Sequence, residues 1–175
     1  MLALLVYNFF IAVFTKSKVY FTYCFYIAAL FLTVVGSQGV IDIIDIFENV
    51  TLSHYLIIFS SSSLISAWYF TLKFLNTDKY IPWFKYIVNI GSILALIPIL
   101  YALSPWFDSG AWMFGNYIDL LIPIGVLSFI FAGIVVSIKK EVLGYIYLLS
   151  WSFLFVGAFM YLGSVHGLLG RGFIY

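Results

Sequence analysis

The side chains that could do chemistry are few in this chain and lie far apart. Its 175 residues include seven acidic groups, two histidines and one cysteine. The sequence shows no His-x-x-x-His pair, no paired intramembrane aspartates, no nucleophile elbow and no phosphate-binding glycine loop. Cys24 alone cannot form an intrachain disulfide or a thiolate metal cluster. We therefore expect no catalytic residue, no metal site and no cofactor.

Asp119 is the ionisable residue with the strongest claim to a function, because it lies inside an apolar run, 117–138. A charged side chain within a membrane span is costly and usually marks a functional position. Asn116 and Tyr117 precede it near the predicted outer end of the span, and His166 is expected on the same side of the membrane. We take these four residues as the candidate ligand or coupling site. The alternative is an interfacial anchor or helix cap that water reaches.

Two other polar clusters have simpler explanations. Asp42, Asp45 and Glu48 recur every third residue, which places them on one face of a helix. They predict either a patch for cations and basic ligands or a solvated face that lies on the outer membrane surface, and we favour the solvated face. Ser60–Ser63 and Ser66 suit a polar pathway or close helix packing, and we favour packing.

The composition identifies the elements that carry these residues. The chain is 65% hydrophobic and 9% charged, with a mean hydropathy of +1.13, whereas soluble domains carry roughly 25% charged residues. Only helices or closed barrels satisfy backbone groups in lipid, and the apolar runs lack a period of two. We therefore predict an all-α, polytopic transmembrane bundle with no soluble domain. Its expected spans are 2–14, which is too short to cross alone, 19–40, 54–75, 86–103, 117–138 and 142–162.

Lysine positions predict an orientation for these spans. Seven of the eight basic residues fall in alternate connections, and Arg171 is the exception. The positive-inside rule puts the seven on the cytoplasmic side of a plasma (inner) membrane and both chain termini outside. This alternation requires 2–14 to cross. The net charge of +1 also argues against a nucleic-acid partner. The seven are Lys16, Lys18, Lys73, Lys79, Lys85, Lys139 and Lys140.

A set of short features, spread over nearly the whole chain, carries a resemblance to a known family. In chain order they are Tyr7-Asn8, Tyr20, Gly36 and Gly39, Phe70-x-x-x-Phe74-Leu75, Pro82, Gly133, Trp151, Gly157 and Gly167-Leu168-Leu169. Their order resembles the transmembrane region of the bacterial seven-transmembrane receptors with diverse intracellular signalling modules, the DISM class. In that layout the chain lacks the first half of span one and all of span seven.

The resemblance implies a receptor module in the lipid bilayer that relays an outside stimulus inward and performs no chemistry itself. It also implies an extracellular β-sandwich sensor and a cytoplasmic output such as a histidine kinase, a diguanylate cyclase or a phosphatase. A homo-oligomer is compatible with this layout. The main alternative is a small multi-span transporter or channel subunit, which needs polar residues aligned along a path. An intramembrane enzyme and a structural partner of another membrane protein are further alternatives.

Overall fold

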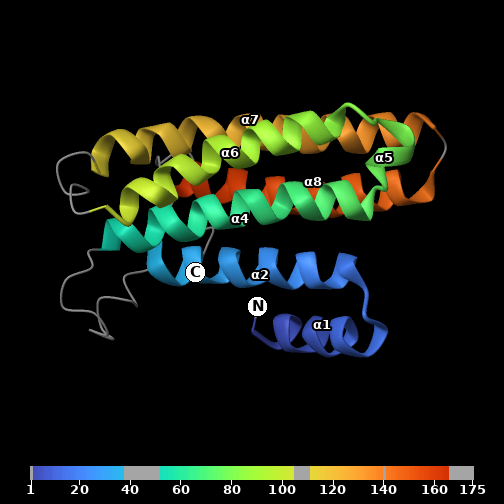
Figure 1. Cartoon of the computed structure of the whole chain (residues 1–175), viewed down its shortest axis with the longest axis horizontal. Helices are drawn as coiled ribbons and strands as arrows, with labels where there is room; N and C mark the ends of the chain where they lie inside the picture. Colours follow the sequence, from blue (N-terminus) through green and yellow to red (C-terminus); the bar gives the residue numbers. More distant parts are fainter. Residues whose placement is uncertain (1, 38–51, 105–110, 140, 166–175) are drawn as a thin grey trace.

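The computed structural model shows helices packed side by side (Figure 1). It describes residues 2–37, 52–104, 111–139 and 141–165, without the side chains of 52–53, 111–112 and 154–165. No strand occurs in these residues, so the predicted all-α bundle is confirmed. The helices are α1 (Leu2–Thr15), α2 (Lys18–Ser37), α4 (Leu52–Phe74), α5 (Thr77–Tyr80), α6 (Phe84–Ala102), α7 (Ala111–Ile138) and α8 (Val142–Val165).

Helix lengths match the thickness of a bilayer for most of the chain. Within the described residues, four helices are long and apolar enough to cross. Helix α1 is a shorter apolar helix, and so is Val142–Phe153, the part of α8 whose side chains are described. The 14 residues of α1 reach about 21 Å at 1.5 Å per residue, less than the ~30 Å hydrocarbon core. The four long stretches are Lys18–Gly36, His54–Phe74, Phe84–Ala102 and Met113–Ile138.

Helix α4 lies at the centre of the arrangement and packs against α2, α6 and α7. Helix α8 packs against α7, and α1 packs against α2 at the edge of the bundle (Figure 1). The outer faces of these helices carry large apolar side chains, as lipid contact requires. Examples at least 60% exposed are Ile90, Ile93, Leu100, Leu120 and Leu127.

Trp68 explains why α4 occupies the centre. Its side chain is 1% exposed, and its Nε1 donates a hydrogen bond to Ser128 Oγ on α7 at 2.9 Å. On the α6 side the ring lies against Gly91, where an added Cβ would come within 2.6 Å of it. Glycine at this position lets α6 approach the indole, which is how small residues bring membrane helices close.

A second close approach joins α7 to α8. A Cβ added at Gly144 would lie 2.6 Å from the backbone nitrogen of Ser137. Backbone atoms cannot move aside as a flexible side chain can, so this crossing requires glycine. It fixes how α8 leaves the turn after α7 and therefore how its next residues face the bundle.

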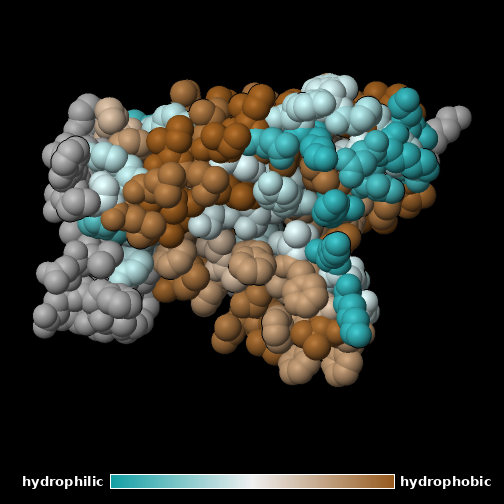
Figure 2. Space-filling model, in the orientation of Figure 1, coloured by the Kyte–Doolittle hydropathy of each residue, from teal (hydrophilic) through white to brown (hydrophobic). Residues whose placement is uncertain are grey.

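Three helix connections gather at one end of the bundle, which we call the basic end: α1 to α2, α4 through α5 to α6, and α7 to α8 (Figure 1). Figure 2 shows hydrophilic surface concentrated toward this end and hydrophobic surface along the flanks. Lys16 and Asn76 adopt left-handed backbone angles there, with φ of 50° and 48°, where the chain reverses. All six lysines of the described residues lie here: Lys16, Lys18, Lys73, Lys79, Lys85 and Lys139.

Candidate functional site

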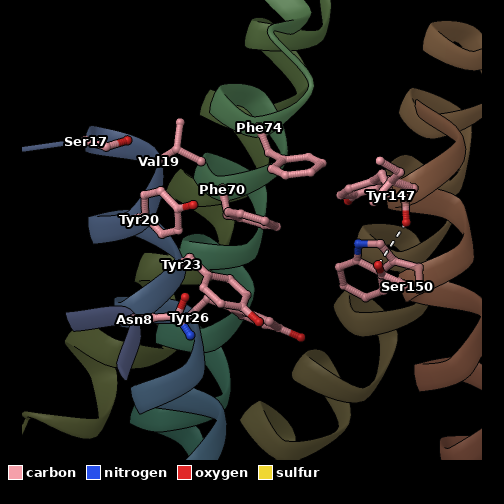
Figure 3. Close-up of a pocket in the computed structure, with 12 residues that line it drawn as sticks. Asn8, Ser17, Val19, Tyr20, Tyr23, Tyr26, Phe70, Phe74, Tyr147 and Ser150 are labelled. Atoms are coloured by element: carbon pink, nitrogen blue, oxygen red, sulfur yellow. Dashed lines mark hydrogen bonds between the residues drawn. The ribbon is translucent and has the colours of Figure 1, made fainter. Parts of the chain in front are cut away.

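A crevice of about 580 Å³ opens between α1, α2, α4 and α8 in the half of the bundle nearer the basic end (Figure 3). Its walls are mostly aromatic, with a few hydroxyl groups and one amide, and no charged side chain lines it. The lining residues are Asn8, Ser17, Val19, Tyr20, Tyr23, Tyr26, Phe70, Phe74, Ile146, Tyr147, Ser150 and Trp151.

Helix α2 provides one wall through three tyrosines. Tyr20, Tyr23 and Tyr26 recur every third residue and so form a stripe along one side of the helix. The stripe covers about 9 Å at 1.5 Å per residue. Tyr23 and Tyr26 also contact the Phe70 ring of α4, with ring centroids 5.1 and 6.5 Å apart.

Helix α8 provides the opposite wall and is tied to α4 by a buried hydrogen bond. The hydroxyl oxygens of Tyr147 and Thr71 lie 2.6 Å apart. Thr71 gives its own proton to the Ala67 carbonyl at 2.8 Å, so Tyr147 is the donor in this pair. Both side chains are at most 2% exposed. In a medium without water, this pair satisfies two groups whose separation would be costly.

A chain of aromatic rings crosses the bundle from the crevice. Tyr26 of α2 contacts Trp151 of α8 at 6.3 Å between ring centroids, and Trp151 contacts Phe129 of α7 at 4.9 Å. Phe129 in turn meets Trp68 of α4 edge-on at 6.2 Å. These distances lie in the range over which aromatic pairs attract. These contacts join α2, α8, α7 and α4 through one continuous series of rings.

Five polar side-chain atoms that line or border the crevice make no hydrogen bond within the described residues. They are the hydroxyl oxygens of Ser17, Tyr20, Tyr23 and Tyr26 and the Oδ1 of Asn8. The Asn8 amide nitrogen is satisfied, because it donates to the Leu4 carbonyl at 2.8 Å. The crevice thus presents hydroxyl groups, which can donate and accept hydrogen bonds, and one amide oxygen, which accepts, inside an otherwise apolar surface.

A polar contact joins two connections at the basic end. Tyr80, the last residue of α5, donates a hydrogen bond to Glu141 in the turn between α7 and α8. Lys79 donates to the same Tyr80 hydroxyl at 2.8 Å and lies 3.9 Å from Glu141 Oε1. The hydrogen bond with Tyr80 is the main cause that raises the pKa of Lys79 above its ordinary 10.5. The contact links α5 to the turn before α8.

The residues proposed from sequence as a ligand site occupy different surroundings. Asn116 and Asp119 are exposed on the outside of α7, and His166 lies outside the described residues. Tyr117 is half-buried and donates a hydrogen bond to the Leu94 carbonyl of α6 at 3.2 Å. Because α7 begins at Ala111, Asp119 sits eight residues, about 12 Å, into the helix.

The remaining polar clusters do not form a metal site in the part of the chain that the structure describes. The acidic trio Asp42, Asp45 and Glu48 falls outside the described residues. In the serine patch, Ser60 and Ser66 donate to carbonyls of their own helix, at 2.5 and 2.7 Å. These bonds occupy the donors of Ser60 and Ser66, whereas the buried hydroxyl of Ser61 makes no hydrogen bond within the described residues.

Sequence reasoning did not identify the crevice, yet a signal for it was present. Five residues that carry the family resemblance, far apart in the sequence, line its walls: Asn8, Tyr20, Phe70, Phe74 and Trp151. They come from four helices. Periodicity within any single helix cannot reveal such a convergence, because it depends on how the helices pack.

The fold and the crevice define the class of protein: a polytopic helical bundle of the membrane whose helices are coupled through buried aromatic rings. The family model described as "7TM diverse intracellular signalling" matches residues 1–175. The chain therefore belongs to this family, and the predicted resemblance is confirmed. No curated protein and no solved structure matches it.

Proposed function

We propose that this bundle is a receptor module that passes a stimulus across the membrane by changing how its helices pack. Membership of the signalling family supports a receptor. The observation that carries the mechanism is the ring contact between Tyr26 of α2 and Trp151 of α8. Through it, motion of α2 reaches α8, α7 and α4 together. Packed interfaces of this kind switch between discrete arrangements instead of deforming continuously.

The basic end faces the cytoplasm in this proposal. The positive-inside rule supports this orientation, because all six described lysines lie at that end. The contact between Tyr80 and Glu141 then lies on the cytoplasmic side, where α5 joins the turn before α8. An output domain on that side would sense the spacing of these connections.

The stimulus enters at the opposite end, and Asn116 and Asp119 on the outside of α7 are the groups proposed to receive it. Their exposure supports access by a ligand or a sensor domain. Asp119→Asn removes the charge while keeping the shape of the side chain. We expect it to change the response to the stimulus; an unchanged response would remove these residues from the proposal.

A transporter is the main alternative, and two observations count against it. α6 and α7 continue as helices through Pro98 and Pro123, whereas transporter sites are built from discontinuous helices near the bilayer midplane. The crevice also lacks a charged lining residue. Purified protein in liposomes is expected to pass amino acids, sugars and small ions no faster than protein-free liposomes do.

The signalling proposal is tested in the cells that make the protein. Trp151→Ala removes the ring that joins α2 to α7, while Leu149→Ala changes a side chain that is 61% exposed on the same helix. Phosphorylated proteins and cyclic dinucleotides are then measured, because these are the products of the output domains implied by the resemblance. We expect a change of about 5-fold for Trp151→Ala only, which corresponds to a shift of about 1 kcal/mol in a two-state equilibrium. No change in either variant, at equal amounts of inserted protein, contradicts the proposal.

A further inference from the structure

The backbone of α6 lacks one helical hydrogen bond in the half of the helix farther from the basic end. Pro98 lies inside the helix and has no N–H, so the bond that the Leu94 carbonyl would accept from residue 98 is missing. The proline ring also crowds this carbonyl and pushes it away from the helix axis. An unpaired carbonyl is costly in the hydrocarbon region, because no bulk water is present to donate to it.

Tyr117 of α7 supplies the missing donor. Its hydroxyl oxygen lies 3.2 Å from the Leu94 carbonyl oxygen, to which it donates a hydrogen bond. The two residues meet because α6 and α7 pack side by side (Figure 1). Groups on neighbouring helices commonly satisfy the backbone that a proline frees in a membrane helix. The tyrosine of one helix thus completes the backbone of the other.

Pro98 also lies at the boundary between two apolar clusters. Ala95, before the proline, belongs to the main buried core. Ala102, after the proline, belongs to a smaller cluster with Ile57 of α4 and Ile118 of α7. Prolines are the usual positions at which helices bend sharply. A bend at Pro98 can therefore change the angle between the two clusters while each cluster stays packed.

Tyr117 occupies the same boundary on α7. Its half-buried ring packs against both clusters. On the side of the smaller cluster it meets Phe114 edge-on at 6.4 Å between ring centroids. Phe114 stacks in turn on Tyr101, which lies beyond the proline on α6, at 4.2 Å. The last part of α6 is therefore joined to α7 by rings, and the Tyr117 hydroxyl adds a bond across the boundary.

We propose that α6 has a hinge at Pro98 and that the hydrogen bond from Tyr117 to Leu94 fixes this hinge in one arrangement. Asn116 and Asp119 lie beside Tyr117 in the chain, so a shift of α7 at these two residues moves the hydroxyl that holds the hinge. Use of the hinge as a switch rests on the proposed receptor function. The hinge and its hydrogen bond do not, because they follow from the packing of α6 and α7.

A double-mutant cycle tests whether Tyr117 serves the carbonyl that Pro98 frees. Tyr117→Phe removes only the hydroxyl, and Pro98→Ala restores an N–H for the Leu94 carbonyl. Unfolding of the intact protein is measured in detergent for both single variants and the double variant. We expect Tyr117→Phe to raise the equilibrium constant of unfolding about 3-fold, as the loss of an average hydrogen bond between membrane helices does. In the Pro98→Ala background the same substitution should leave it nearly unchanged.

A matched tyrosine provides the control for this cycle. Tyr86 lies on α6 before the proline and is exposed. Tyr86→Phe should have the same small effect with and without Pro98→Ala. An effect of Tyr117→Phe that is equal in the two backgrounds would overturn the proposal, because the hydroxyl would then act independently of the proline.

Spin labels test the hinge itself, in a background with Cys24→Ala. Leu103 at the end of α6 and Ile90 before the proline are both exposed, and each is paired with exposed Leu32 on α2, which packs on α4. Double electron–electron resonance then compares the two parts of α6 with the same reference. We expect Tyr117→Phe to add a second distance population between Leu103 and Leu32 and to leave the distance between Ile90 and Leu32 unchanged.

Pro98→Ala decides whether the second population comes from the hinge. Combined with Tyr117→Phe, it should return the Leu103–Leu32 pair to a single population, because the continuous helix no longer bends there. Unchanged distances in Tyr117→Phe, or equal changes in both label pairs, would overturn the hinge. If Pro98→Ala does not insert, the distances in Tyr117→Phe alone decide. These measurements need neither a stimulus nor an output domain, so failure of the receptor proposal leaves their expected results intact.

Discussion

Tyr147 and Thr71 hold α8 against α4 with one buried hydrogen bond of 2.6 Å. Tyr147→Phe removes only the hydroxyl group. We predict that it lowers the free energy of unfolding by about 0.6 kcal/mol, the average for hydrogen bonds between membrane helices, and by no more than about 1.7 kcal/mol, their maximum. A double-mutant cycle with Thr71→Val isolates the pair. Tyr86→Phe, at a ring that is 70% exposed, is the control. A coupling energy near zero contradicts the assigned bond.

Gly144 lies at the close crossing of α7 and α8, where one added carbon atom tests the packing. Gly144→Ala places a Cβ 2.6 Å from the Ser137 backbone nitrogen, whereas a Cβ at Gly115 meets nothing within 4 Å. We predict that Gly144→Ala lowers the free energy of unfolding by about 1–3 kcal/mol, as overpacking does. Gly115→Ala is expected to be neutral or slightly stabilising, since alanine is the better helix former. Equal thermal stability of the two variants in detergent contradicts the close crossing.

At the scale of the element, α5 is a four-residue helix that connects α4 to α6. Tyr80 at its end bonds Glu141, and Lys79 adds a hydrogen bond to the same hydroxyl. We predict that Glu141→Gln changes signalling output by about 5-fold, which corresponds to a bias of about 1 kcal/mol in a two-state equilibrium. The free energy of unfolding should change by less than about 1 kcal/mol, because exposed ion pairs contribute little. Asp78→Asn, which changes an acidic residue of α5, is the control. An output equal to that of the unchanged protein removes this contact from the relay.

Sequence patterns located the helices well and their starts less well. The expected run from 117 was set by hydropathy, but α7 begins at Ala111, because Gly115 and Asn116 are accommodated inside an established helix. Hydropathy marks where lipid begins, whereas the hydrogen-bonded backbone continues past that point. The change matters for Asp119, which lies deeper in a helix than the sequence suggested.

The candidate site was less accessible to sequence reasoning than the fold. Asp119 was proposed because a charged side chain within a membrane span is costly. That argument considers one residue by itself. The crevice depends on Asn8, Tyr23 and Tyr147 meeting from three helices. Tyr23 and Tyr147 look like ordinary aromatic positions in their own runs, and Asn8 is a single amide in an apolar run. Only the packing of α2 and α8 around α4 brings them together.

At the scale of the whole molecule, the clustering of lysines at one end makes a topological prediction. In a background with Cys24→Ala, a single cysteine at Lys79 should react with a membrane-impermeant maleimide only after the cells are opened. A cysteine at Met113, which is 52% exposed at the start of α7, should react in intact cells. The opposite labelling pattern would reverse the orientation and place the Tyr80–Glu141 contact outside.

The proposed relay requires the spacing between α2 and α8 to change while α2 stays packed on α4. Spin labels at Lys18 and Val142, both exposed at the basic end, report this spacing by double electron–electron resonance. Labels at Lys18 and Lys73 report the extensively packed pair α2 and α4 as a reference. We expect two distance populations between Lys18 and Val142, and we expect Trp151→Ala to change their proportions. We expect a single population between Lys18 and Lys73. A single distance between α2 and α8 that Trp151→Ala leaves unchanged would contradict the proposed relay.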